Sequence, residues 1–74
     1  MTETAFLDRF GKVSQVDIGI VQQLSNDVSR KDIAEELGID KRNLDARIDN
    51  LRKKVKINSV AGMVALFFRN KLIE

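Results

Sequence analysis

Basic side chains gather in one segment of this 74-residue chain, residues 40–56. That segment holds seven Lys and Arg residues against three Asp residues, a local charge of +4, whereas residues 1–39 carry −3 and residues 57–74 carry +1. A basic segment on an acidic body predicts a surface that binds a polyanion such as a nucleic acid. On charge alone, a solvated helix surface is the more common explanation. The secondary structure that carries these residues is therefore needed to decide between the two explanations.

The chain has no Cys and no His, two residue types that many enzymes use in catalysis. Disulfides, the usual zinc sites, thiol nucleophiles and Ser-His-Asp catalysis are therefore excluded. Carboxylate, Lys and Arg side chains remain, but 74 residues make one small domain with little room for a cleft. We expect no enzymatic activity, no metal and no cofactor.

The sequence offers no membrane span, which needs roughly 20 consecutive apolar residues. The longest apolar run, residues 60–68, is too short, and the first residues lack the basic start and apolar middle of a signal peptide. These features predict a cytoplasmic protein that does not enter a membrane.

Apolar residues follow a helical period through nearly the whole chain, which contains no proline. We expect a short N-terminal helix or arm over residues 1–12, with Phe6, Leu7 and Phe10 at helical spacing, and one domain over residues 13–74. The predicted fold class is therefore all-α: a four-helix, helix-turn-helix domain with a short extra N-terminal element.

Two serines mark the first two helices of this domain. Ser14 and Ser29 each stand three residues before an Asp, which is the form of a capping box. The first helix should end near Ser25, and Gly38 suits the left-handed conformation that ends the second. The expected apolar stripes of these helices are Ile18, Val21 and Leu24, and Ile33, Ala34 and Leu37.

Asp40 is positioned to cap a third helix, over about residues 41–55, only two residues after Gly38. A short helix, a tight turn and a new helix in direct succession are the outline of a helix-turn-helix. The core side of the third helix is predicted to hold Leu44, Ile48, Leu51 and Val55, and its opposite side Arg42, Ala46, Asp49 and Lys53. A last helix follows over about residues 59–71, capped by Asn58 or Ser59.

Several motifs in this region share one order and spacing with a known family. They are the run Ser29-Arg-Lys-Asp-Ile-Ala-Glu-Glu-Leu-Gly-Ile-Asp40, the pairs Asn43-Leu44 and Asn50-Leu51, and Lys54-Val55-x-Ile57. They resemble, without a gap, the patterns Ser-Asn-Lys-Glu-Ile-Ala-x-x-Leu-x-Ile-Ser, Thr-Val, Asn-Ile and Lys-Leu-x-Val. Those patterns belong to the LuxR/GerE-type (NarL-like) DNA-binding domain, a four-helix module of many bacterial transcription regulators. The resemblance covers about residues 13–72 and implies dimerisation through the last helix.

Two departures from the family concern charge. The family's early Arg-Glu pair is Val16-Asp17 here, so its internal ion pair cannot form in the usual way. Asp45 and Asp49 stand where many members carry a basic or polar residue, and carboxylates that face phosphates would repel them. Either carboxylate could instead accept a hydrogen bond from cytosine, or pair along the helix with Lys41, Arg42, Arg52 or Lys53.

The third helix supplies most of the predicted DNA contacts, in the major groove. Arg47 lies nearer its core side, where a structural role is the alternative. Arg30 and Lys31, at the start of the preceding helix, suit phosphate contacts and equally suit simple exposure. On the third helix, we expect Arg42, Asn43, Ala46 and Asn50 to face base edges, and Lys41, Arg47, Lys53 and Lys54 to face phosphates.

The last helix is apolar on nearly all sides, which is more than a three-helix core can cover. One stripe should face the core, and a second stripe should form the interface of a homodimer. The alternative cover is the N-terminal segment, through Phe6, Leu7 and Phe10. The expected core stripe is Val60, Met63, Val64 and Phe67, and the expected interface is Ala61, Ala65, Phe68 and Leu72, with Leu66 and Ile73 beyond it.

Together these features predict a transcription regulator that binds double-stranded DNA as a dimer on two half-sites. The alternative is a protein-interaction module on the same fold, contacting another regulator or RNA polymerase, in which Asp45 and Asp49 have abolished the reading of a groove. Binding that falls steeply with salt would distinguish the regulator from the interaction module.

Overall fold

The computed structural model describes residues 11 and 13–74. These residues form four helices and no strand: α2 (Gln15–Ser25), α3 (Arg30–Leu37), α4 (Lys41–Lys54) and α5 (Val60–Arg69). The prediction of an all-α domain is confirmed for this part of the chain. The expected N-terminal helix or arm lies outside the described residues, apart from Gly11. No described helix is long and apolar enough to cross a membrane.

Each of the four helices begins at a side chain that accepts a hydrogen bond from the backbone N–H three residues further on. Ser14, Ser29 and Ser59 accept through their hydroxyl oxygens at 3.1, 3.2 and 3.0 Å, and Asp40 accepts through a carboxylate oxygen at 2.7 Å. Such a cap satisfies one N–H group that the first turn of a helix leaves without a partner. The predicted caps are confirmed, and Ser59 rather than Asn58 caps α5.

All four helices are also followed by the same turn, in which a left-handed residue comes one or two positions after the end of the helix and an apolar residue comes next. The left-handed residues are Asp27, Gly38, Lys56 and Lys71, with φ between 60° and 71°. The apolar residue after each donates its N–H to the carbonyl five residues back, at 3.0–3.1 Å, as in a Schellman motif. These apolar residues pack against the core, so the turns join helices and cover the core at once. They are Val28, Ile39, Ile57 and Leu72.

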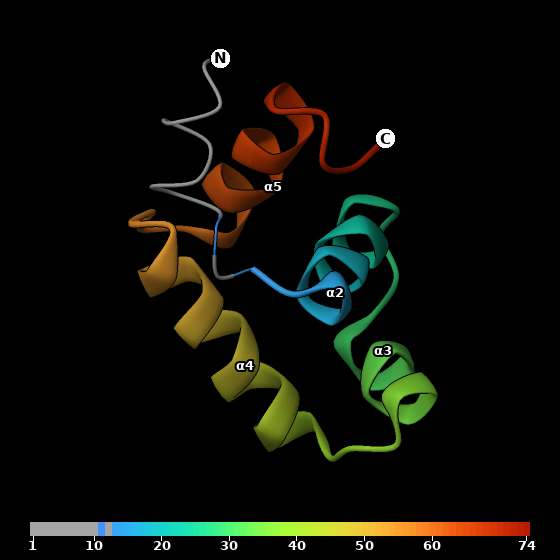
Figure 1. The fold of residues 1–74 in the computed structure, drawn as a ribbon. Helices are drawn as coiled ribbons and strands as arrows, with labels where there is room; N and C mark the ends of the chain where they lie inside the picture. The colour runs from blue at the N-terminus through green and yellow to red at the C-terminus, as the bar shows by residue number, and fades with distance from the viewer. Residues whose placement is uncertain (1–10, 12) are drawn as a thin grey trace.

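α2 lies in the middle of the domain and contacts the other three helices (Figure 1). α5 lies on one side of α2, and α3 and α4 lie on the other, with α4 along the edge of the molecule. The three-residue turn 38–40 joins α3 to α4, and these two helices pack against each other. The C-terminal residues return to α2, where the side-chain amide of Gln22 pairs with the carbonyl and the N–H of Glu74, at 3.0 and 2.7 Å.

The core stripe expected for α4 is confirmed, because Leu44, Ile48, Leu51 and Val55 are all buried. The stripe expected for α2 is only partly right. Val21 is buried as predicted, but its buried neighbour is Ile20, while Ile18 and Leu24 are partly buried at the edge of the core. α2 contacts helices on both of its sides, so a stripe chosen for a single neighbour does not describe it.

α5 ends at Arg69, two residues earlier than expected. Met63 and Phe67 are buried as predicted, and Val60 and Val64 are partly buried. The expectation for Leu66 and Ile73 is wrong, because both belong to the core. Ile73 reaches the core since the left-handed Lys71 turns the chain back onto the domain, which helical spacing does not anticipate.

The left-handed turn between α3 and α4 generates a prediction for Gly38. Gly38→Ala should lower the free energy of unfolding by about 1 kcal/mol, because a Cβ is unfavourable at φ 71°. Gly19→Ala is the matched control: Gly19 lies within α2 with no atom within 4 Å of an added Cβ. It should raise the free energy of unfolding by roughly 0.5–1 kcal/mol. Urea unfolding measures both, and equal changes of the same sign would contradict the assigned turn.

Candidate nucleic-acid interface

The rotation of α4 about its own axis decides which of its side chains meet solvent. Successive side chains of an α-helix are about 100° apart around its axis. When the core stripe of α4 faces inward, a sector of about 140° on its outer side contains no carboxylate. The side chains of this sector are all exposed, and in angular order they are Arg42, Lys53, Ala46, Asn50, Asn43, Lys54 and Arg47. Cations therefore occupy both edges of the sector, and two amides and a methyl group occupy its middle. We call this sector the acid-free face of α4.

Both carboxylates of α4 lie on the flank between the core stripe and the acid-free face, and both are paired. Asp45 accepts a hydrogen bond from Arg30 at 2.7 Å and one from Lys41 at 3.2 Å, and Asp49 pairs with Arg52 at 3.3 Å. Lys41 and Arg52 were among the expected partners, whereas Arg30 comes from α3 and was not. Hydrogen bonds from the Arg30 guanidinium and the Lys41 ammonium hold the pKa of Asp45 below its ordinary value.

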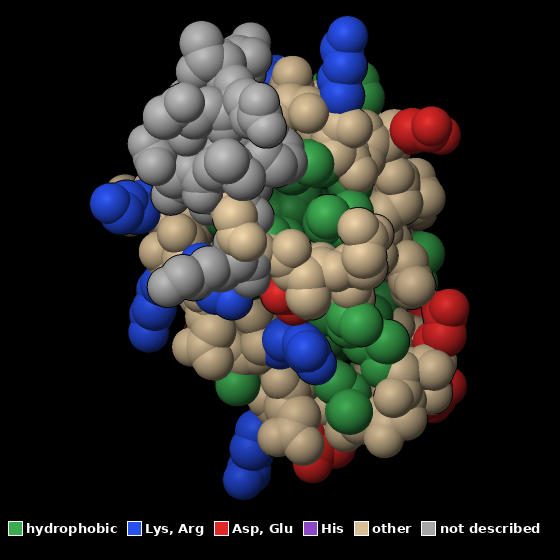
Figure 2. All heavy atoms as spheres, in the orientation of Figure 1, with side chains coloured by type: hydrophobic (Ala, Val, Ile, Leu, Met, Phe, Trp, Pro, Cys, Tyr) green, Lys and Arg blue, Asp and Glu red, His purple; other side chains and the backbone are tan. Residues whose placement is uncertain are grey.

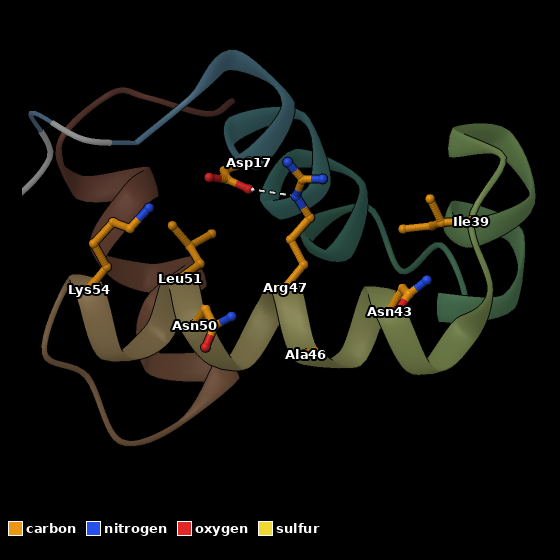
Figure 3. Close-up of a pocket in the computed structure, with 8 residues that line it drawn as sticks. All are labelled: Asp17, Ile39, Asn43, Ala46, Arg47, Asn50, Leu51 and Lys54. Carbon is orange, nitrogen blue, oxygen red and sulfur yellow. Dashed lines mark hydrogen bonds and ion pairs between the residues drawn. The ribbon is translucent and has the colours of Figure 1, made fainter.

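Arg47 extends from α4 to α2, where its Nε lies 3.3 Å from Oδ1 of Asp17 (Figure 3). Asp17 is only 7% exposed, so the pair joins a buried carboxylate to a guanidinium at the surface. Asp17 also lies in the first turn of α2, where the helix dipole favours negative charge. Arg47 thus makes a contact within the protein, which is compatible with the structural alternative, and its contact with DNA stays a prediction. The pair that Asp17 forms with Arg47 is therefore an ion pair between two helices of the domain.

An open hollow of about 500 Å³ lies between α4, Asp17 of α2 and Ile39 of the turn after α3. Five of the predicted DNA-binding residues line this hollow. Figure 3 shows the two Asn side chains along α4, with Arg47 and Lys54 extending toward α2. Because the hollow is open to solvent, it suits a large partner laid against it better than an enclosed small molecule. The five residues are Asn43, Ala46, Arg47, Asn50 and Lys54.

The remaining predicted DNA-binding residues divide into two groups. Arg30 and Lys41 are engaged with Asp45, which ties the start of α3 to α4. Lys31, Arg42 and Lys53 are exposed and make no ion pair with a described residue. Figure 2 shows Lys and Arg side chains along the edge of the molecule that α4 forms, and several Asp and Glu side chains along the opposite edge, by α3 and the C-terminus.

The residues expected to form a dimer interface are not equivalent. Ala61, Ala65 and Phe68 are exposed on α5, and Phe68 is the most exposed large apolar side chain of the described residues, at 61%. Leu72 is partly buried and packs against the core, because it follows the end of α5 instead of continuing its stripe.

Comparison with protein-family models, with curated proteins and with solved structures gives no match for this chain.

The pairing of Asp45 predicts how stability depends on pH. Because the pKa of this carboxyl is lower in the folded state than its unfolded value of about 3.9, its charge stabilises the fold above that pH. This contribution is lost as pH falls through the folded pKa. Asp45→Asn should therefore be less stable than the wild type at pH 6, and the difference should vanish at low pH.

Urea unfolding at a series of pH values between 6 and 2 measures this difference. Asp27→Asn is the control, because Asp27 makes no ion pair with a described residue and Asn also tolerates its left-handed backbone. A difference between wild type and Asp45→Asn that stayed constant with pH would contradict the assigned pairing.

Proposed function

We propose that this protein is a DNA-binding transcription regulator that places α4 in the major groove of duplex DNA. The observation that carries the proposal is the acid-free face, in which cations lie along both edges of a stripe of amide and methyl groups. An α-helix is about 10–12 Å across with its side chains, and the major groove is about 12 Å wide. A helix in that groove directs the middle of its outer face at base edges and both margins at the phosphates of the two strands.

The connection between α3 and α4 supports this proposal. An eight-residue helix, the turn 38–40 and a fourteen-residue helix are the elements of a helix-turn-helix, in which the second helix enters the groove and the first crosses the backbone. In this arrangement Lys31, which is exposed in the first turn of α3, would contact a phosphate of the DNA backbone. The resemblance of residues 13–72 to the LuxR/GerE-type domain points to the same use of the two helices.

The pairing of Asp45 and Asp49 weakens the main argument for the alternative function. The protein-interaction module requires that these two carboxylates repel DNA from the side of α4 that would face the groove. Asp45 is instead held by two cations on the flank of α4, and Asp49, next to the edge of the acid-free face, is paired with Arg52. Neither carboxylate needs to lie against a phosphate when the middle of that face meets the bases.

The exposed side of α5 supports the proposal that the regulator is a homodimer. Phe68 is a large apolar side chain in solvent, with Ala61 and Ala65 on the same helix to allow close approach of a second copy. A dimer with two-fold symmetry would bind two half-sites about one turn of DNA apart. The interface proposed here includes Ala61, Ala65 and Phe68 but not Leu72, which packs inward.

DNA binding is tested with labelled random-sequence duplexes at low and moderate salt. We expect the wild type to bind, with an affinity that falls steeply as salt rises. Arg42→Ala and Lys53→Ala should each weaken binding to all sequences and reduce the slope of log affinity against log salt by about 1. Arg69→Ala, which removes a cation from α5, is the matched control and should change neither. A folded protein with no affinity for DNA at low salt would refute the proposal and favour the interaction module.

Oligomeric state is tested by light scattering. The wild type should be a dimer, and Phe68→Glu should be a folded monomer, because a carboxylate would be buried without a partner in the interface. Val16→Glu is the matched control, since Val16 is also an exposed apolar residue, at 45%, but lies on α2. A Phe68→Glu protein that unfolds, or that remains dimeric, would contradict the proposed interface.

A further inference from the structure

Two side-chain amides lie in the middle of the acid-free face. Asn43 and Asn50 are both exposed, and both line the hollow beside α4. They are seven residues apart, close to two full turns, so they lie on the same side of the helix. The side-chain amide of neither residue makes a hydrogen bond to a described residue. Asn43 takes part in the helix cap through its backbone N–H, which donates to Asp40, and not through its side chain. Ala46 lies between the two on the same face.

The chemistry of these groups is selective among bases. A carboxamide offers one donor and one acceptor side by side, which matches the N7 acceptor and the N6 donor of adenine in the major groove. Guanine presents two acceptors there and pairs better with Arg or Lys. On α4 the Arg and Lys side chains of the acid-free face lie at its edges, where phosphates would lie. A small methyl group such as that of Ala46 fits against the methyl group of thymine.

We propose that α4 reads A·T base pairs, with Asn43 and Asn50 each bound to an adenine and Ala46 against a thymine methyl group. The proposal rests on the DNA binding proposed above and specifies which sequences that surface prefers. Seven residues of helix span about 10.5 Å, and base pairs are about 3.4 Å apart along the duplex. The two adenines are therefore about three base-pair steps apart within each half-site.

The first experiment selects duplexes from a random pool with the wild-type protein and reads the preferred sequence. Selected half-sites should contain two adenines about three steps apart. Each adenine in turn is then replaced by 7-deazaadenine, which removes the N7 acceptor and leaves the Watson–Crick pairing unchanged. Each replacement should weaken wild-type binding about three- to tenfold, as expected for the loss of one hydrogen bond.

Two alanine variants assign the residues. Asn43→Ala should bind equally well with or without N7 at one adenine and keep its sensitivity at the other, and Asn50→Ala should show the reverse. A general loss of helix structure would weaken binding to every duplex and would not produce this exchange. Both substitutions replace exposed side chains of α4 by the best helix former, so the fold should persist. Arg69→Ala should retain both sensitivities.

The outcomes separate this inference from the function on which it rests. Salt-sensitive binding without a preference for adenine, or with a preference that does not respond to loss of N7, would overturn the reading of A·T pairs and leave DNA binding standing. The absence of any DNA binding at low salt would overturn both. Adenine selection with the exchange of sensitivities between Asn43→Ala and Asn50→Ala would support both.

Discussion

The burial of four apolar side chains of α4 fixes the rotation of this helix about its axis. Leu44, Ile48, Leu51 and Val55 are at most 2% exposed. Moving such side chains into water costs roughly 1.5–3 kcal/mol each, so no other rotation of α4 competes. One consequence is that the acid-free face is turned outward while both carboxylates of α4 are kept to one flank. The placement of charge on the surface thus follows from the placement of apolar groups in the core.

Ion pairs connect α4 to its neighbours on two sides of the core stripe. Arg30 of α3 reaches Asp45 on one side, and Asp17 of α2 accepts from Arg47 on the other. The pair of Arg30 and Asp45 is partly exposed, and exposed ion pairs typically contribute only about 0–1 kcal/mol to the free energy of unfolding, so its main effect is on the direction of the side chains and on local charge. The negative charge of Asp45 is offset by the cations paired with it, and the side chain of Arg47 lies along the hollow beside the acid-free face.

The amount that the sequence could predict differs between elements. The stripe of α4 was predicted correctly because its apolar residues have one spacing and the helix has one buried side. The stripes of α2 and α5 were predicted in part, since α2 lies between other helices and α5 is followed by a chain that turns back. Leu66 and Ile73 were misplaced for this reason. Their burial depends on what lies opposite α5 and on where the chain turns after it, and the spacing of apolar residues along the chain encodes neither.

The starts of the helices were determined by the sequence itself, because a capping side chain lies only three positions before the N–H group from which it accepts a hydrogen bond. Ser14, Ser29 and Asp40 identify the starts of helices without any knowledge of packing. Only the tertiary structure decided the partners of charged residues. Arg30 meets Asp45 across 15 positions and Arg47 meets Asp17 across 30. Such pairs exist only after burial of the core has brought separate helices together, and a spacing along one helix contains no information about the helix packed beside it.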